Sequence, residues 1–470
     1  MNIGLLAPEL FQLLIILALF VASITSGRDK GDPVWLPGAA VAGIFVAAAS
    51  VGARGILFYD AYQVDGLSQF FKVAISIGYA VTVLNALNQP TLEKEKRTDY
   101  FMLLSMAAWG LMLLSSCVEL ITLYLALELA SYSLYALVPL RGTDKRAAEA
   151  GIKYILFGAM VTAIALYGLS FVMAEQHSTY LSVLVTKPWS FAAAPMAVIG
   201  LTLFLGGFFY KLALFPFHFW APDVYQGASN ETASYVATVP KLGAVVVLVR
   251  LSAVLTPGME ITNILALLGA LSMTFGNLAA LVQTDLKRLL GYSSVAHAGY
   301  VMLGLVSGTA AGLSAAVFYS LVYLLMNLTC FWVVCRIADK GENVTLDGLN
   351  GLYKRAPVLA LVLAVAAFAL VGLPPTAGFT GKLFLLTSAW EHGYNWLVIV
   401  AVLNTAISIY YYLNLVRHAY TKDAENETAL PVSYFNATVA GALAVIVLLL
   451  GILPGPFYAL AKAAGQGLLP

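Results

Sequence analysis

The chain has 470 residues, of which 61% are hydrophobic and only 10% are charged, and its formal net charge is +1. A soluble domain usually carries about a quarter charged residues, so this composition excludes an ordinary soluble protein. It also gives no support for nucleic-acid binding. Three cysteines lie in or beside apolar runs without a Cys-x-x-Cys pair or a histidine cluster, so no metal or iron–sulfur site is predicted. No glycine-rich phosphate loop marks a nucleotide or flavin site.

Apolar runs of roughly 18 residues or more are long enough to cross a bilayer. They predict an all-α polytopic membrane protein in which residues 1–470 form a single membrane domain. The first run lacks a basic leader and a cleavage site, so it is expected as a retained helix. About fourteen transmembrane helices are expected, at residues 9–26, 34–51, 68–89, 99–117, 119–140, 150–174, 194–220, 230–255, 262–282, 287–306, 312–337, 357–390, 394–418 and 434–456.

Two of these runs, 194–220 and 357–390, are too long for one straight span and contain helix breakers. Pro216 lies in the first, and Pro374 and Pro375 lie in the second. Interrupted helices are tolerated at membrane depth only where the freed backbone is buried in protein or lines a wet cavity. Helices 7 and 12 are therefore predicted to be broken, and the breaks to mark the functional interior.

The two broken runs are five helices apart, which predicts an internal repeat. An odd offset reverses topology, so helices 4–8 and 9–13 are expected to be inverted copies, a layout found in many transporters. Their predicted extents are residues 99–255 and 262–418.

Basic residues in the connections predict the orientation. The connections after odd-numbered helices hold sixteen lysines and arginines, whereas the opposite side holds only Arg54, Lys187 and Lys462. The cation-rich side is expected in the cytoplasm and both termini outside. The sixteen are Arg28, Lys30, Lys94, Lys96, Arg97, Arg141, Lys145, Arg146, Lys287, Arg288, Arg336, Lys340, Lys354, Arg355, Arg417 and Lys422.

Four ionisable residues, Glu128, Lys211, Lys241 and Lys382, lie inside apolar runs. A charge near the bilayer centre costs roughly 2.5–3.5 kcal/mol on insertion scales, so four of them indicate function, here a proton path. Burial favours the neutral form of a lysine and a nearby carboxylate favours its charged form, so Glu128 and Lys211 are expected to form a pair. Topology places Lys241 near mid-membrane, as a central relay, and Lys382 nearer the outer face. A structural role for each residue alone stays open, for instance snorkelling of Lys241.

Five motifs carry a family resemblance over nearly the whole chain. They are ELASYSLYALV (128–138), GGFFYKLALFPFHFWAPDVYQGA (206–228), VPKLG (239–243), DLKRLLGYSSVAHAGYVMLG (285–304) and VGLPPTAGFTGK (371–382). The chain resembles the subunit N family of bacterial respiratory complex I, the proton-translocating NADH:quinone oxidoreductase. The DVYQGA stretch and Lys382 distinguish this family from the sister antiporter-like subunits.

The resemblance implies a fourteen-helix antiporter-like subunit of the membrane arm, which translocates protons and holds no cofactor. Flavin, iron–sulfur clusters and quinone would belong to partner subunits. The expected partners are the sister antiporter-like and small membrane subunits, together with the lipid of the bacterial inner membrane. Its functional set would be Glu128, Lys211, Lys241 and Lys382, with a secondary set of Lys153, His218 and His297.

Several residues outside this set receive a structural interpretation. After QGA, family members usually continue with a proline-rich stretch, whereas this chain reads SNETAS from Ser229 to Ser234. Glu231 is interpreted as a solvated residue capping a helix, with an extra proton collector as the alternative. Lys72 and Arg250 are expected to snorkel from segment ends. The remaining interpretations are a helix-start role for Glu119 and packing or an interfacial belt for Tyr410, Tyr411 and Tyr412.

Three functions remain compatible with the sequence. The first is a complex I subunit driven by quinone chemistry elsewhere. The second is a free-standing or Mrp-type cation/proton antiporter, which the DVYQGA stretch and the lack of an acidic cluster disfavour. The third is a purely structural membrane scaffold, which the buried charges argue against.

Overall fold

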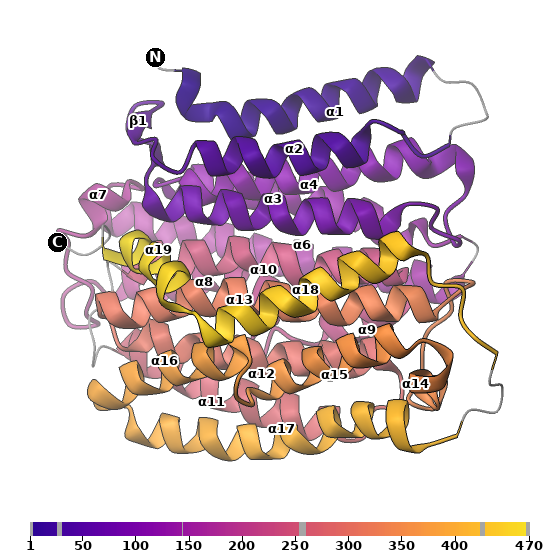
Figure 1. Cartoon of the computed structure of the whole chain (residues 1–470). Coiled ribbons are helices and arrows are strands. Elements are labelled where there is room, and N and C mark those ends of the chain that lie inside the picture. The colour runs from indigo at the N-terminus through magenta and orange to yellow at the C-terminus, as the bar shows by residue number, and fades with distance from the viewer. Residues whose placement is uncertain (1–2, 26–30, 143, 253–259, 424–427, 467–470) are drawn as a thin grey trace.

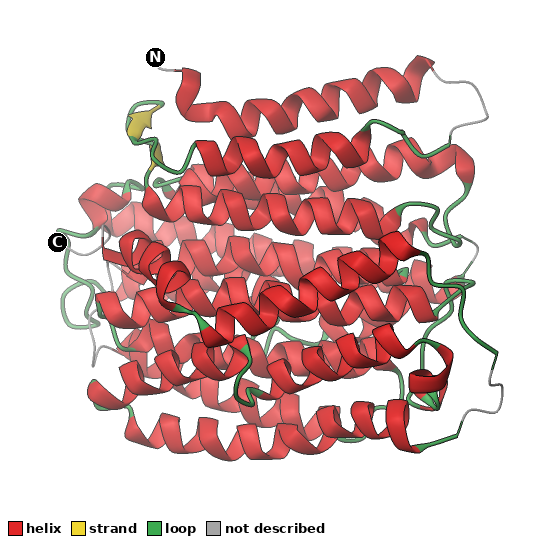
Figure 2. Ribbon diagram, viewed as in Figure 1, coloured by secondary structure: helices red, strands yellow, loops and turns green. Residues whose placement is uncertain are grey.

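The computed structural model describes residues 3–25, 31–142, 144–252, 260–423 and 428–466. The described chain is a bundle of long helices that lie side by side (Figure 1). Figure 2 shows how little of it is strand: one antiparallel hairpin of β1 (Gly55–Leu57) and β2 (Tyr62–Val64). The helices in chain order are α1 (Ala7–Thr25), α2 (Leu36–Ala49), α3 (Gly66–Ala86), α4 (Arg97–Ser116), α5 (Leu120–Leu137), α6 (Lys145–Gln176), α7 (Leu181–Leu184), α8 (Pro195–Leu212), α9 (Trp220–Gly227), α10 (Asn230–Leu251), α11 (Glu260–Ala280), α12 (Leu286–Val306), α13 (Ala310–Ile337), α14 (Leu352–Arg355), α15 (Pro357–Val371), α16 (Ala377–Glu391), α17 (Asn395–Thr421), α18 (Tyr434–Ile452) and α19 (Gly455–Gln466).

The prediction of an all-α polytopic membrane protein is confirmed. Within the described residues, twelve helices are long and apolar enough to span a membrane, and α2 and α15 are shorter apolar helices. Each of the fourteen expected runs coincides with one of these helices, the run 357–390 holds both α15 and α16, and the run 194–220 holds α8 and ends where α9 begins. The β-hairpin, α7, α14 and α19 were not expected, because each is too short for an 18-residue apolar window.

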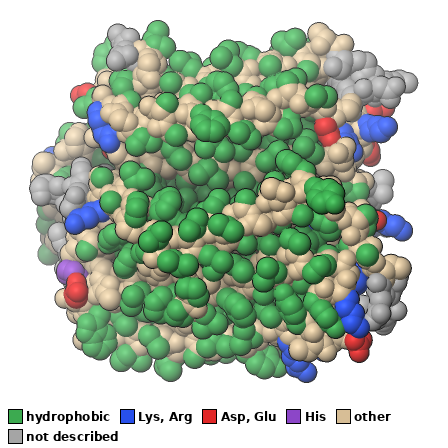
Figure 3. Space-filling view, viewed as in Figure 1, with side chains coloured by type: hydrophobic (Ala, Val, Ile, Leu, Met, Phe, Trp, Pro, Cys, Tyr) green, Lys and Arg blue, Asp and Glu red, His purple; other side chains and the backbone are tan. Residues whose placement is uncertain are grey.

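The surface has the pattern of a membrane protein. On the face drawn in Figure 3, hydrophobic side chains cover the long sides of the helices, and charged side chains gather at the two ends of the bundle. The first helix, α1, begins at the end of the bundle where the last helix, α19, lies (Figure 1). An even number of crossings produces this arrangement.

Two helices form the centre of the bundle. In α10 and α13 every residue of the apolar window is buried, and in α12 94% of it is. A close backbone contact positions α8 against α6: a Cβ at Gly168 of α6 would lie 2.5 Å from the carbonyl oxygen of Gly200 of α8. Small residues at such crossings let membrane helices approach closely. This contact fixes α8, which carries Lys211, against α6.

A buried group of charges joins the amino-terminal helices to the core. Lys72 of α3 is fully buried, and its Nζ lies 2.6 Å from Oε1 of Glu9 on α1. The Tyr62 hydroxyl donates to the same carboxylate at 2.5 Å. Nearby, Arg250 of α10 donates two hydrogen bonds to Asp65, at 2.9 and 3.0 Å. We name Glu9, Tyr62, Lys72, Asp65 and Arg250 the N-terminal ion-pair cluster. The expectation that Lys72 and Arg250 snorkel towards water is wrong, because both side chains are paired inside the protein.

Some connection cations are also less exposed than the sequence suggests. Lys287 is fully buried and Arg141 is 7% exposed. Both donate to the Ala228 carbonyl oxygen rather than reaching water. Arg28 and Lys30 lie outside the described residues. The helix-start role of Glu119 is confirmed, since its carboxylate accepts hydrogen bonds from the backbone N–H groups of Ile121 and Thr122 at the start of α5.

Candidate functional site

The two breaks create free helix ends inside the bundle. At the end of α8, Ala213 adopts a left-handed conformation with φ +61°, and Pro216 follows before α9 begins. At the end of α15, Gly372 has φ +90° and precedes Pro374 and Pro375. A left-handed residue followed by proline is a common helix stop. Each stop leaves backbone carbonyl groups without intrahelical partners and with the partial negative charge of a helix carboxyl terminus.

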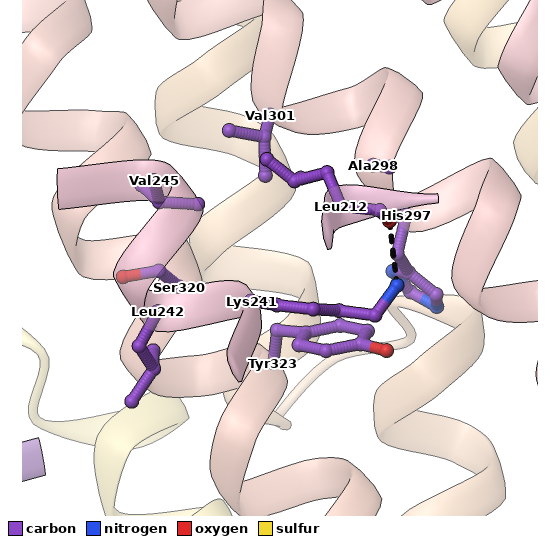
Figure 4. A pocket seen from close by; sticks show the side chains of 9 residues that line it. All are labelled: Leu212, Lys241, Leu242, Val245, His297, Ala298, Val301, Ser320 and Tyr323. Carbon is purple, nitrogen blue, oxygen red and sulfur yellow. Dashed lines mark hydrogen bonds between the residues drawn. The ribbon is translucent and has the colours of Figure 1, made fainter. Parts of the chain in front are cut away.

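Lys241 occupies the first of these ends. Its Nζ donates a 2.6 Å hydrogen bond to the Leu212 carbonyl oxygen, the last residue of α8 (Figure 4). The side chain is 4% exposed and its Nζ lies 5.8 Å from the centre of the Tyr323 ring. Pro240, the preceding residue, removes a backbone N–H from α10. One turn earlier, the Tyr323 hydroxyl donates to the Ala237 carbonyl oxygen at 3.0 Å.

Lys382 occupies the second end in the same manner. Its Nζ donates to the Val371 carbonyl oxygen at 2.8 Å, at the end of α15. It also lies 4.3 Å from the centre of the Tyr300 ring. Both lysines therefore sit on the carbonyl end of a broken helix and against a tyrosine ring. Neither lysine has a carboxylate partner among the described residues.

Lys211 and Glu128 are near each other but not in contact. Lys211 lies in the last turn of α8, 3.5 Å from the Tyr154 hydroxyl and 5.5 Å from the centre of the Tyr135 ring. Glu128 of α5 is 6% exposed, and its Oε1 is buried without a hydrogen-bond partner. Across the described residues no ion pair joins Glu128 to Lys211, although the two charges interact electrostatically. The predicted pair is thus a longer-range one, with aromatic rings lying against the ammonium group.

His297 lies between Lys241 and Lys382. Its Nδ1 is hydrogen-bonded to the Tyr319 hydroxyl at 2.6 Å and its Nε2 to the Tyr412 hydroxyl at 3.1 Å. It interacts electrostatically with both lysines. His297 and Lys241 line one small cavity of about 10 Å³ (Figure 4). That is close to the roughly 10–15 Å³ that one buried water needs. We name Lys211, Lys241 and Lys382 the lysine line, with His297 between its last two members.

Lys153 and His218 lie outside this line. Lys153 forms ion pairs with Glu149 at 2.8 Å and Asp223 at 2.7 Å, and 37% of its side chain is exposed. Burial raises the pKa of Asp223, but the ion pairs with Lys153 and Arg288 outweigh this and hold it below its usual value. His218 is 1% exposed and packs against three phenylalanine rings, with its Nδ1 unpartnered.

The tyrosine network was missed from the sequence. Tyr411 and Tyr412 are buried and packed on each other, which fits the interpretation as packing, but Tyr412 also joins His297 and Ser293 by hydrogen bonds that this interpretation did not include. Tyr410 is 68% exposed and fits that interpretation. A signal was present in Tyr319 and Tyr323, which are four residues apart and therefore share one face of α13.

Across the described residues, no cluster of three or more histidine, cysteine, aspartate or glutamate side chains could hold a metal ion. The free cysteines Cys117, Cys330 and Cys335 are buried, in keeping with their interpretation as small core residues.

A membrane-embedded bundle with two broken helices, each closed by a buried lysine, defines the class of antiporter-like ion-translocating membrane subunits. A family model described as NADH:quinone oxidoreductase/Mrp antiporter, TM, matches residues 117–408, and the chain belongs to this family. The matched range contains the whole lysine line and Glu128.

Similar proteins agree over the full length. The chain is 68% identical over 469 residues to NADH-quinone oxidoreductase subunit N 2 of Solidesulfovibrio magneticus, covering 99% of each chain. It superposes on a chain of respiratory complex I from Thermus thermophilus with TM-score 0.84 and 34% identity, covering 97% of this chain and 99% of the other. A chain of the Mrp complex from Dietzia has TM-score 0.89 at 18% identity, covering 100% and 98%, which is a likeness of fold. The resemblance to subunit N inferred from the motifs is confirmed.

Proposed function

We propose that this chain is the subunit N of a complex I-type NADH:quinone oxidoreductase and moves protons through the lysine line. The observation that carries the proposal is the placement of Lys241 and Lys382 on the carbonyl ends of broken helices, without carboxylate partners. A lysine held by carbonyls and rings keeps its site whether charged or neutral. It can therefore gain and lose a proton without breaking an ion pair.

The order of transfer follows from the geometry. Glu128 acts on Lys211 over a distance, so a change in the charge of Glu128 alters the proton affinity of Lys211 without direct contact. Lys241 closes the helix in which Lys211 occupies the last turn. His297 and its two tyrosine partners then connect Lys241 to Lys382. Lys153 serves as a secondary group in the ion-pair cluster with Asp223, and His218 as a secondary group beside the first break.

The repeat and orientation complete the proposal. Residues 99–255 and 262–418 are two inverted repeats, which places the two lysine-closed breaks in equivalent positions. The cation-rich end faces the cytoplasm and both termini face the periplasm of a bacterial inner membrane. Without the buried Lys287 and Arg141, the connections on the two sides hold fourteen and three lysines and arginines. The same side therefore remains the cation-rich one.

The partners follow from the same assignment. Sister antiporter-like subunits and small membrane subunits would surround this chain in the membrane arm. Flavin, iron–sulfur clusters and quinone would be held by partner subunits, as the membership in the subunit N family suggests. Quinone reduction there would drive the protonation changes here.

A free-standing cation/proton antiporter is the second candidate, favoured only by the fold it shares with the Mrp complex chain. Purification of the chain from native membranes separates the two. The proposed function predicts a large complex that carries flavin and iron–sulfur clusters. An antiporter would purify as a small assembly without either.

The direct test is Lys211→Ala in the assembled complex, with proton pumping and quinone reduction measured together in membrane vesicles. We expect loss of pumping, with electron transfer lost or slowed. Lys96→Ala is the matched control, because Lys96 is a solvent-exposed lysine at the surface. Normal rates of both activities in Lys211→Ala would reduce Lys211 to a structural residue.

In the same assay Glu128→Gln is expected to slow pumping, and a wild-type rate would remove Glu128 from the path.

A further inference from the structure

Glu231 is a buried carboxylate that the sequence interpretation treats as a solvated cap. It lies in the first turn of α10 and is 3% exposed, and its Oε2 has no hydrogen-bond partner. Ser229 already caps the helix, since its Oγ accepts a hydrogen bond from the Thr232 backbone N–H. A carboxylate here is not needed to start α10. The solvated-cap interpretation is therefore wrong.

A polar cavity leads from the surface to this carboxylate. The cavity has a volume of about 380 Å³ and lies at the cation-rich end of the bundle. Exposed Asn88, Asp339 and Ser433 line its outer part, and Glu231 and Cys335 line its inner part. A cavity of this size and polarity has room for several waters. Water from the aqueous side can therefore reach Glu231.

The charged and titratable groups facing Glu231 come from three other helices. Lys287 of α12 and Arg336 of α13 interact electrostatically with the Glu231 carboxylate. Tyr100 of α4 and Cys335 of α13 also interact electrostatically with this carboxylate. Lys287 is fully buried, and its Nζ donates to the Ala228 carbonyl oxygen at 2.6 Å. Among the described residues Glu231 forms no ion pair with either cation. Lys287 thus shares one feature with Lys241 and Lys382, an ammonium group on a backbone carbonyl, here that of Ala228 at the end of α9.

A series of hydrogen-bonded hydroxyl groups leads from Tyr225 of α9 to the Tyr323 ring beside Lys241. The Tyr225 hydroxyl is hydrogen-bonded to Ser294 Oγ at 3.2 Å, and Ser294 Oγ to the Tyr323 hydroxyl at 2.9 Å. The Tyr323 ring lies against the Lys241 ammonium group. Ser294 is seven residues, or two turns, beyond Lys287 on the same face of α12. Glu231 and Lys241 are ten residues apart on α10, a separation of roughly 15 Å along the helix axis, and these two hydrogen bonds account for the part of it nearest Lys241.

We propose that Glu231 and Lys287 form a proton-uptake site that supplies Lys241 from the cavity at the cation-rich end. This proposal rests on the proposed function of the lysine line. A proton from water in the cavity binds the Glu231 carboxylate and forms a carboxylic acid. The acid O–H then breaks as a neutral Lys287 amine takes the proton, which restores the carboxylate and forms an ammonium group. The ammonium group loses that proton towards the Tyr225, Ser294 and Tyr323 hydroxyl series, and neutral Lys241 gains a proton at the far end.

A structural role for Glu231 makes a different prediction. A carboxylate in the first turn interacts favourably with the helix dipole, and glutamine at this position would lose only that interaction. Pumping per assembled complex would then be unchanged in Glu231→Gln. An uptake group fails in the same variant, because glutamine cannot bind and release the proton.

The experiment compares Glu231→Gln, Glu231→Asp and wild type in the assembled complex, with proton pumping and quinone reduction measured in vesicles. We expect Glu231→Gln to lose pumping with slowed quinone reduction, and Glu231→Asp to retain more of both because it keeps a carboxylate. Glu95→Gln, an exposed glutamate at the same end, is the matched control. Wild-type pumping in Glu231→Gln would overturn the proposal.

Two further measurements keep the outcomes distinct. Lys241→Met in the same vesicles tests the lysine line. If this variant pumps normally the proposed function fails, whereas normal pumping in Glu231→Gln alone removes only the uptake site.

If Glu231→Gln does not assemble, chemical labelling of the wild-type complex tests the proposal instead. A hydrophobic carbodiimide reacts with protonated carboxyl groups, so labelling of Glu231 detected by peptide mass spectrometry supports proton uptake there. Absence of that label would overturn the proposal.

Discussion

The two buried groups of charges differ in how their cations are satisfied. In the N-terminal ion-pair cluster, Lys72 and Arg250 each meet a carboxylate within hydrogen-bonding distance. In the lysine line, Lys241 and Lys382 meet only backbone carbonyls and tyrosine rings. Both groups are buried to a similar degree, so burial alone does not separate a structural charge from a mobile one.

The difference lies in what happens when a proton leaves. Deprotonation of Lys72 would leave Glu9 as an isolated buried anion, which is strongly unfavourable. Deprotonation of Lys241 leaves only carbonyl groups, which carry partial charges and tolerate the loss better. Paired lysines therefore hold the fold together, whereas lysines on helix ends are suited to exchange protons. Substitutions at three positions, Lys241, Lys72 and Asp65, test this comparison.

The largest expected effect is on transport, in Lys241→Arg and Lys241→Met. Arginine keeps the positive charge and can still donate to the Leu212 carbonyl oxygen, but it does not release its proton in proteins. We expect both variants to lose proton pumping in vesicles that contain assembled complex, because both remove proton exchange. Lys96→Arg is the control at an exposed position. Full pumping by Lys241→Arg would mean that closing the helix end is all that Lys241 does.

The next effect is on stability, in Lys72→Met. Breaking a buried ion pair by removing one partner typically costs about 3–5 kcal/mol. We expect less assembled complex and a lower temperature of thermal dissociation, with pumping per assembled complex unchanged. The double variant Glu9→Leu with Lys72→Met removes both charges and is expected to recover most of the stability. A stable Lys72→Met complex that fails to pump would move Lys72 into the proton path.

The long helices of the bundle were predictable from the sequence, whereas the β-hairpin, α7, α14 and α19 were not. Fourteen apolar runs and the prolines at 216, 374 and 375 predicted the helices and both breaks, because run length and helix stops are local properties. The motifs around Lys211, Lys241 and Lys382 identified the family before any geometry was known. Lys241 and Lys382 are also buried inside the bundle, as expected for charges that act within the membrane.

The partners of these residues could not be predicted, because they come from distant parts of the chain. Glu9 and Lys72 are 63 positions apart and meet only in the folded chain, whereas the position of Lys72 near a segment end is typical of a snorkelling residue. The tyrosines that surround His297 come from α13 and α17. Lys287 was read as a loop cation, since its sequence neighbours do not show that the end of α9 covers it.

The smallest of the three effects concerns Asp65→Asn, at the edge of the N-terminal ion-pair cluster. Burial raises the pKa of Asp65, but the paired Arg250 outweighs it and holds that pKa below its usual value. A lowered folded-state pKa means that the carboxylate stabilises the fold above its unfolded pKa of about 3.9, and that this is lost as pH falls through the folded value. We expect Asp65→Asn to cost about 1.5–3 kcal/mol at neutral pH, the usual contribution of a hydrogen bond to a charged group. Thermal stability of the wild-type and variant complexes should differ by a constant amount from neutral pH downwards and converge only below about pH 4. A difference that is already absent at neutral pH would show that Arg250 is held by its bonds to the Ser115 carbonyl oxygen alone.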